Sequence, residues 1–307
     1  MEKVIVVIGP TSVGKTKMGV ALAKKFNGEV ISGDSMQIYK QMDIGTAKVT
    51  EEEKEGIIHH CVDILNPDET YSVHDFQQTV RKKITEITQR GHVPIIVGGT
   101  GLYIKAALYD YQFDEMENDH HAINEKYKDY TNEQLHDHLK SIDEESAKIL
   151  HFNNRRRVLR AIEIYETTGK RKSEMLEEQE HICLYDAYFV GLTLPRDVLY
   201  ERINKRVDVM MENGLKEEME RLYSQGLTRN HQSMKAIGYK EWFDYYDHQI
   251  DLNDVLELIK KHSRQYAKRQ YTWFKNQCDV HWYDVNLENF EQTIEQVTDD
   301  IEKILKV

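Results

Sequence analysis

Near its beginning the chain carries the stretch Val4-Ile5-Val6-Val7-Ile8-Gly9-Pro10-Thr11-Ser12-Val13-Gly14-Lys15-Thr16. The first five of these residues are β-branched and apolar, which is typical of a strand buried on both faces of a parallel sheet. The last eight match G-x-x-x-x-G-K-[ST], the pattern of a glycine-rich turn that leads from a strand into a helix. This stretch therefore predicts an α/β fold with a phosphate-binding loop after its first strand.

The loop residues are expected to bind phosphate through backbone and side chain together. Glycine lets backbone N–H groups approach phosphate oxygens without an intervening Cβ, and a helix N-terminus adds partial positive charge. Lys15 is expected to reach the terminal phosphates and Thr16 to ligate Mg²⁺, the predicted cofactor. The pattern is shared with nucleotide- and ATP-binding proteins and predicts a bound di- or triphosphate. The predicted binding residues are Gly9, Pro10, Thr11, Ser12, Val13, Gly14, Lys15 and Thr16.

Alternating strand and helix patterns follow this loop. Helical spacing of apolar residues appears from Lys17 to Phe26 and from Val73 to Arg90, and short apolar runs appear at Glu29–Ser32 and Val93–Val97. Strand–helix–strand repetition implies parallel pairing with right-handed crossovers. We therefore predict a P-loop NTPase-like parallel sheet flanked by helices.

Composition excludes several classes of protein. The 307 residues include 41 Lys+Arg and 53 Asp+Glu, so the net charge of −12 argues against a surface that is cationic throughout. A hydrophobic content of 40% argues against wholesale disorder. The three cysteines stand far apart, which makes a zinc site or disulfide framework improbable and fits a reducing compartment. No apolar run approaches membrane-spanning length, so we expect a cytoplasmic protein with no membrane partner. We also expect a monomer.

A change of character near Gln112 indicates an insertion. Residues 114–145 contain eleven Asp+Glu against three Lys, whereas residues 153–172 contain seven Lys+Arg against two Glu. Helices are predicted at about 131–139 and 143–151, and a strand pattern returns at Tyr185–Leu194. We therefore predict a catalytic core formed by 1–112 and 187–307, with a helical insertion domain at 113–186. From Asp197 onward the pattern is helical nearly to the end.

Asp34 is the acidic residue that follows a predicted strand close to the phosphate loop. P-loop enzymes usually place a metal-binding carboxylate at a strand end, but Val93–Val97 ends instead in the uncharged Gly98-Gly99-Thr100-Gly101. Because the carboxyl ends of parallel strands line the ligand crevice, Asp34 and Thr100 are expected to face the phosphate site. There Asp34 can bind metal or act as a general base; a solvated loop aspartate is the alternative.

Several sequence blocks together resemble the tRNA dimethylallyltransferase family. These are GPTSVGKT at 9–16, DSMQIY at 34–39, DIGTAK at 43–48, GGTGLY at 98–103, RRRVLRAIEIYETTGK at 155–170 and KAIGYKE at 235–241. Members of that family transfer a dimethylallyl group from dimethylallyl diphosphate to the exocyclic amine of adenosine 37 in the tRNA anticodon loop. The eukaryotic branch carries a carboxy-terminal zinc finger, and no Cys pair or His pair supplies one in this chain. The chain therefore resembles the bacterial form.

The resemblance implies roles for individual residues. Asp34 is similar to the general base, Thr16 and Lys15 to the holders of diphosphate and Mg²⁺, and Arg206 to an arginine that supports the diphosphate, which makes Asp34, Thr16 and Arg206 the implied catalytic residues. The anticodon stem-loop of tRNA is the implied partner of the core and of the insertion. Its implied contacts are Asp34, Ser35, Met36, Gln37, Thr100, Arg156, Arg157, Val158, Leu159, Arg160, Lys235, Lys240, Lys268 and Arg269.

Other interpretations of the charged and aromatic residues remain open from sequence. Arg155–Arg160 can also be the solvated face of a helix, and Lys260–Lys275, with six cations and no acid, predicts a phosphate-binding surface rather than base stacking. The pairs His59-His60 and His120-His121 are predicted to be surface histidines, and Trp242 is predicted to pack in the core.

Three other functions are compatible with parts of this pattern. The phosphate loop alone also fits a P-loop kinase that uses ATP. The same prenyl donor can serve an enzyme whose acceptor is a free adenine nucleotide. A nucleotide-dependent RNA-binding protein without catalysis is the third alternative.

Overall fold

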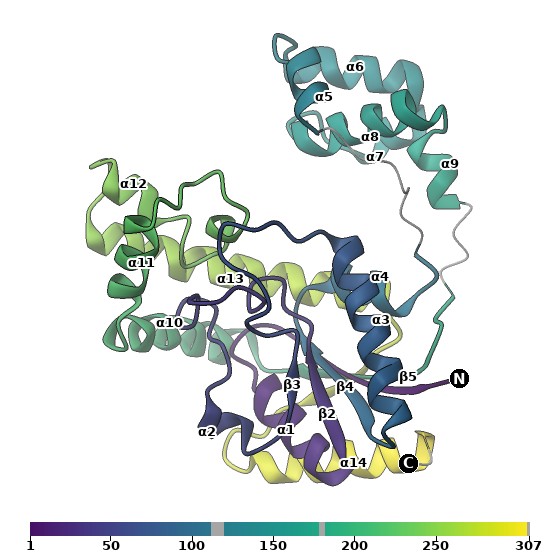
Figure 1. The fold of residues 1–307 in the computed structure, drawn as a ribbon, viewed down its shortest axis with the longest axis vertical. Coiled ribbons are helices and arrows are strands. Elements are labelled where there is room, and N and C mark those ends of the chain that lie inside the picture. The colour runs from purple at the N-terminus through teal and green to yellow at the C-terminus, as the bar shows by residue number, and fades with distance from the viewer. Residues whose placement is uncertain (112–119, 178–181, 306–307) are drawn as a thin grey trace. The chain divides into compact units, whose positions relative to one another are not determined.

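The computed structural model describes residues 1–111, 120–177 and 182–305 (Figure 1). The chain divides into a core unit, Met1–Tyr109 with Cys183–Val307, and an insertion, Asp110–Ile182. The boundaries thus lie a few residues before the predicted 113 and 186. The reason is local pairing: Tyr109 forms a bridge with Cys183, and Leu184 N donates to Leu108 O at 2.8 Å, so residues 183–186 already belong to the core unit.

A six-stranded parallel sheet forms the centre of the core unit. Its strand order is β3-β2-β4-β1-β5-β6, and every neighbouring pair is parallel. The strands are β1 (Lys3–Ile8), β2 (Gly28–Ser32), β3 (His59–His60), β4 (Val93–Gly98), β5 (Asp186–Thr193) and β6 (His281–Asp284). The predicted parallel sheet, and the strands predicted near residues 4, 29, 93 and 185, are confirmed.

Helices bury both faces of this sheet, as the β-branched run at 4–8 predicts. Ile5 and Val7 lie in one apolar cluster with residues of α1 (Lys15–Lys25) and α14 (Phe290–Leu305). Val4, Val6 and Ile8 lie in the other, with residues of α3 (Val73–Gln89) and α4 (Gly101–Leu108). Figure 1 shows these pairs of helices on either side of the strands.

The core unit contains further helical elements besides these four. They are α2 (Glu51–Lys54), α10 (Arg196–Glu212), α11 (Leu215–Ser224), a short 3₁₀ turn at Ser233–Lys235, α12 (Trp242–Tyr246) and α13 (Leu252–Gln277). Trp242 is fully buried, which confirms its predicted packing role. The expectation of helix from residue 197 nearly to the end is wrong at β6, because His281–Asp284 pairs with the exposed side of β5.

The regular elements among the insertion's described residues are all helices. It contains α5 (His120–Lys126), α6 (Asn132–Ile142), α7 (Glu144–Ile149), α8 (Arg155–Thr168) and α9 (Lys172–Glu177). Leu135, Leu139, Val158 and Ile162 are fully buried in a separate apolar cluster, so this unit has its own core. Part of the acidic stretch that begins at residue 114 lies outside the described residues.

One of the two histidine pairs departs from the sequence prediction. His60 Nε2 lies 2.6 Å from Glu29 Oε2, and Arg90 donates to both oxygens of the same buried carboxylate. The prediction of a surface histidine is therefore wrong for His60, which takes part in an ion-pair network at the edge of the sheet. The side chains of His120 and His121 lie outside the described part of the structure. No helix in the described ranges has both the length and the apolarity needed to cross a bilayer.

Candidate active site

The phosphate loop joins β1 to α1 in a strained, open conformation. Gly14 caps α1 with φ of +109°, and a Cβ at this position would lie 2.7 Å from the ring of Phe290. Ser12 also has positive φ, at +67°, and its buried Oγ has no hydrogen-bond partner in the described structure. The first turn of α1 contains no acidic residue. A loop of this kind leaves N–H and hydroxyl donors available for an anion.

Two partly buried cations converge on this loop. Lys15 Nζ donates to Pro10 O at 2.8 Å, and Arg206 of α10 donates to Thr11 Oγ1 at 3.3 Å. Burial, together with the charge of Arg206, lowers the pKa of Lys15 to about 7, and burial lowers the pKa of Arg206. Within the described residues neither cation forms an ion pair with a carboxylate. Because partly desolvated cations without a carboxylate partner attract negative charge, the site is suited to a polyanionic ligand.

Asp34 lies beside these cations at the end of β2. Its Oδ1 accepts a hydrogen bond from Met36 N at 2.8 Å. Burial raises the pKa of Asp34, while the Met36 N–H and the charge of Lys15 act in the opposite direction. A carboxylate with a raised pKa is well suited to accept a proton near neutral pH. The structure thus places the predicted base close to the predicted diphosphate-binding cations.

The ends of β2 and β4 meet at the same edge, as the strand order requires. Ser35 N donates to Thr100 Oγ1 at 3.2 Å, which joins the DSMQIY block to the GGTGLY block. Ser32 Oγ donates to Gln37 Oε1 at 3.0 Å, so the Gln37 side chain is held close to the strand end. Asp34 and Thr100 therefore lie close together at one edge of the sheet.

Two buried polar residues, which were not predicted from the sequence, hold backbone segments close to the site. Gln270 of α13 accepts from Thr11 N and donates to Gly99 O, both at 3.0 Å. Glu218 of α11 accepts from the backbone N–H groups of residues 43–45, at 2.9 to 3.1 Å, and from Tyr239 Oη at 2.6 Å. A signal for Gln270 was present, because it stands at helical spacing from Ala267 and Phe274, which are also buried.

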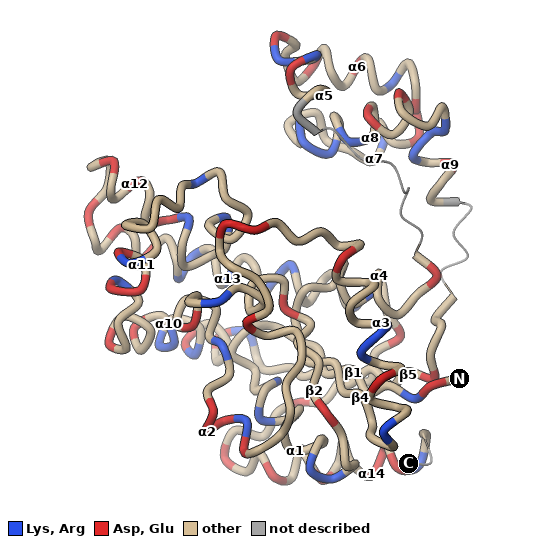
Figure 2. The backbone as a smooth tube through the Cα atoms, in the orientation of Figure 1, with Lys and Arg blue, Asp and Glu red and all other residues tan. Residues whose placement is uncertain are grey.

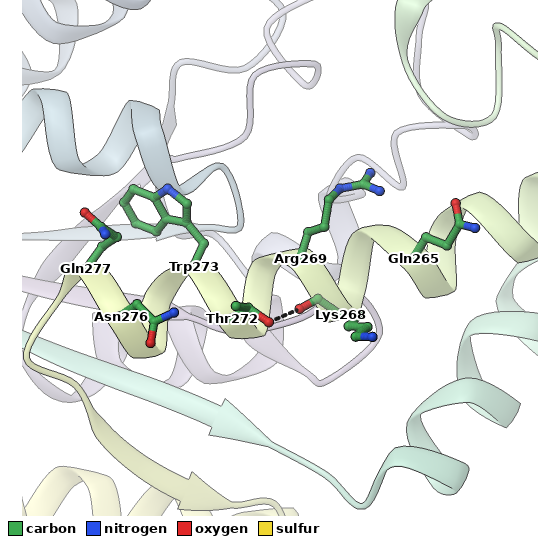
Figure 3. Close-up of a pocket in the computed structure, with 7 residues that line it drawn as sticks. All are labelled: Gln265, Lys268, Arg269, Thr272, Trp273, Asn276 and Gln277. Carbon is green, nitrogen blue, oxygen red and sulfur yellow. Dashed lines mark hydrogen bonds between the residues drawn. The ribbon is translucent and has the colours of Figure 1, made fainter. Parts of the chain in front are cut away.

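The outward face of α13 carries the second basic stretch. An open cavity of about 580 Å³ lies along it (Figure 3), lined by Gln265, Lys268, Arg269, Thr272, Trp273, Asn276 and Gln277. Lys268 and Arg269 are exposed, as are Lys235 and Lys240 elsewhere in the core unit. Lys260, by contrast, pairs with Asp208 at 2.8 Å and with Glu257 at 3.3 Å. The stretch at 260–275 is therefore divided between paired and exposed cations.

The arginines of α8 are likewise divided. Arg156 and Arg157 are exposed, whereas Arg155 donates to Tyr127 O and Tyr130 O, each at 2.7 Å. Arg160 pairs with Glu163 at 2.7 Å.

Val158 and Leu159, which were predicted to contact tRNA, are buried in the insertion. Their relative exposures are 0% and 5%, because both pack in the core of the insertion. The expectation that these two side chains contact tRNA is therefore wrong. Figure 2 shows basic residues at the start of α8 and near α9. Of the predicted contacts from Arg156 to Arg160, the exposed cations are Arg156 and Arg157.

The donor set is compatible with Mg²⁺. Among the described residues no group of three or more His, Cys, Asp or Glu side chains could hold a metal ion. Thr16 is the second residue of α1, directly after Lys15. Mg²⁺ usually takes few protein ligands and retains substrate oxygens and water in its coordination shell. A hydroxyl beside a diphosphate site therefore fits this ion.

Comparisons with known proteins agree with this geometry. Residues 37–277 match the family model described as IPP transferase. A tRNA dimethylallyltransferase of Bacillus cereus (strain AH187) is 55% identical over 92% of this chain and 90% of its own length, and one of Bacillus anthracis is 54% identical over 92% and 91%.

Solved structures give the same result. A tRNA delta(2)-isopentenylpyrophosphate transferase from Staphylococcus epidermidis is 47% identical over 99% of both chains, with a TM-score of 0.74. A eukaryotic dimethylallyltransferase acting on tRNA is 33% identical and covers 99% of this chain and 79% of its own, with a TM-score of 0.86. The chain, with its phosphate loop and its neighbouring carboxylate, belongs to the IPP transferase family.

Proposed function

We propose that the protein transfers a dimethylallyl group from dimethylallyl diphosphate to N6 of adenosine 37 in the tRNA anticodon loop. The observation that carries this proposal is the proximity of a partly buried carboxylate, Asp34, to two partly buried cations without carboxylate partners in the described structure, Lys15 and Arg206. The names and identity levels of the relatives support the same reaction.

In this reaction the bond between the allylic carbon and the diphosphate oxygen breaks as the bond from N6 to that carbon forms. Asp34 accepts the N6 proton, because the aromatic amine becomes acidic as it donates its lone pair. Lys15, Arg206 and the N–H groups of the loop stabilise the negative charge that develops on the leaving diphosphate. Thr100 and Ser35 would orient the adenosine at the edge of the sheet.

Mg²⁺ is proposed as the cofactor, held by the Thr16 hydroxyl together with diphosphate oxygens. When bound, it would neutralise charge on the diphosphate. The protein residues remain responsible for orienting the donor and for removing the proton.

We propose two RNA-binding surfaces, described separately for each unit. The surface of the core unit comprises Lys268 and Arg269 of α13, with Lys235 and Lys240. The surface of the insertion comprises Arg156 and Arg157. Exposed cations can contact phosphates, and adenosine in an RNA loop can be extruded for reaction.

The test is incubation of the full chain with Mg²⁺, dimethylallyl diphosphate and an unmodified tRNA, followed by mass spectrometry of nuclease fragments. The expected product is one dimethylallyl group on the adenosine at position 37. Reactions with AMP as acceptor, or with ATP in place of the prenyl donor, test the two rival enzymes. Prenylation of AMP in preference to RNA, or phosphate transfer from ATP without prenylation, would refute the proposal.

A further inference from the structure

Gln270 occupies an unusual position in α13. It is 6% exposed, while Lys268 and Arg269 beside it are exposed on the outer face of the same helix. Both polar atoms of its amide form hydrogen bonds within the protein. Oε1 accepts from Thr11 N and Nε2 donates to Gly99 O, each at 3.0 Å. The orientation of the amide is fixed by chemistry, because an N–H can only donate and a carbonyl can only accept.

The two partners of Gln270 belong to different halves of the site. Strands β1 and β4 run side by side as far as the pair Ile8 and Gly98, where both strands end. Thr11 lies in the phosphate loop, next to the contact with Arg206. Gly99 directly precedes Thr100, which holds the Ser35 backbone beside Asp34. Gln270 therefore reconnects the diphosphate side and the acceptor side just beyond the sheet.

The packing at Gly99 shows how close this connection is. A Cβ at Gly99 would lie 2.0 Å from Gln270 Nε2, so a side chain there would displace the amide. Tyr266, one helical turn earlier in α13, lies 3.5 Å from the same Gly99 carbonyl through its hydroxyl. Burial raises the pKa of Tyr266 to about 12, so the hydroxyl stays protonated across the usual assay range.

We infer that Gln270 is a positioning residue that fixes the phosphate loop relative to the acceptor side of the active site. This inference rests on the proposed function, in which a carbon of the donor must meet N6 of the acceptor. Such a reaction requires the two atoms to approach to about 3–3.5 Å, and a misplacement of about 1 Å can lower a rate about 10²-fold. A residue that binds both halves controls this approach without touching either substrate.

Two substitutions separate this role from simple packing. Gln270→Met keeps nearly the same volume and removes both hydrogen bonds. Gln270→Glu keeps the acceptor for Thr11 N but donates to Gly99 O only when its carboxyl is protonated. The control is Gln249→Glu, which makes the same chemical change at an exposed residue after α12.

The first measurement is the single-turnover rate with both substrates saturating, alongside separate dissociation constants for inorganic diphosphate and an anticodon stem-loop. We expect both Gln270 variants to lose about 10- to 100-fold in rate, while each dissociation constant changes less than about threefold. The ratio of the Glu variant to the wild-type rate should rise as pH falls, whereas the ratio for the Met variant stays flat. Taking the ratio removes the titration of Asp34, which is common to both proteins.

An unchanged rate in both variants, or a loss of rate matched by an equal loss of diphosphate affinity, would overturn the inference. Failure of the wild-type protein to prenylate RNA would instead refute the proposed function.

Hydrogen–deuterium exchange tests Gln270 independently of turnover. Segments 9–16 and 98–104 should both exchange faster in Gln270→Met than in the wild type, because each loses the same connection. Unchanged exchange in either segment would refute the link even if the enzyme proved to catalyse another reaction.

Discussion

Replacing Glu218 with glutamine tests how much the buried carboxylate contributes to the stability of the core unit. Glu218 is 2% exposed. Oε2 accepts from Asp43 N and Ile44 N, both at 2.9 Å, and Oε1 accepts from Gly45 N at 3.1 Å and from Tyr239 Oη at 2.6 Å. All four partners are donors, so an amide NH₂ in place of either oxygen would face two donors.

The magnitude follows from this count. Each buried donor that loses its acceptor destabilises the fold by about 1–3 kcal/mol, and Glu218→Gln leaves two such donors. We therefore expect the free energy of unfolding to fall by about 2–5 kcal/mol, allowing for local relaxation. Tyr239→Phe is the matched control, because it removes one of the four hydrogen bonds and should lower the free energy of unfolding by about 1–2 kcal/mol.

Urea unfolding followed by tryptophan fluorescence suits this measurement. The three tryptophans, at positions 242, 273 and 282, all lie in the core unit, so the signal reports on that unit and not on the insertion. A loss below about 1 kcal/mol for Glu218→Gln, or one no larger than that of Tyr239→Phe, would show that the carboxylate does not hold the 43–45 segment as described.

Three further predictions concern the reaction and the RNA. Asp34→Ala should lower the single-turnover rate at least about 10²-fold, which is the usual scale for loss of a general base. The dissociation constant for tRNA should be nearly unchanged, and normal turnover would remove Asp34 from that role. The pKa of Lys15 is lowered to about 7, so the fraction of charged Lys15 falls as pH rises through that value and diphosphate affinity should weaken between pH 7 and 9. Calorimetry in buffers of different ionisation enthalpy should detect proton uptake on binding at pH 7–8, and the uptake should vanish in Lys15→Met; identical uptake in both proteins would contradict this assignment. Added salt should weaken tRNA binding despite the acidic total charge, and a double variant with Arg156→Ala and Arg157→Ala should reduce the slope of log Kd against log salt by about 1–2; a slope unaffected by the double variant would exclude α8 from the RNA surface.

The central fold followed from local sequence signals. The run Val4–Ile8 predicted a doubly buried strand, and the spacing of apolar residues predicted α3 to within one residue of its end. The strand β6 was missed because four residues are too few to establish a period, and its formation depends on pairing with β5. Short elements at the edge of a sheet are stabilised by tertiary contacts that local patterns do not contain.

The candidate site was predictable where its residues come from contiguous motifs. Lys15 was predicted from the phosphate-loop motif, and Asp34 and Thr100 from strand ends, because parallel strands bring their carboxyl ends to one edge. Gln270 was hidden in a stretch dominated by cations, and its role appears only when Thr11 and Gly99 are seen to meet it. Val158 and Leu159 were placed with the arginines by resemblance to a motif, although these two residues of α8 pack in the interior while Arg156 and Arg157 are exposed.

The point where the insertion leaves the core unit has a consequence for how such a protein can change. Asp110 N donates to Ile182 O at 3.0 Å, directly after the bridge between Tyr109 and Cys183, so the two connecting segments begin as neighbours. Closing a long loop whose ends already meet adds little entropy per extra residue, since the cost grows only with the logarithm of length. The helical unit can therefore be exchanged, lengthened or deleted as a cassette, with a two- to five-residue turn between 109 and 183 sufficient to close the gap. The helical unit can thus diversify in sequence and length while the sheet of the core unit keeps its register.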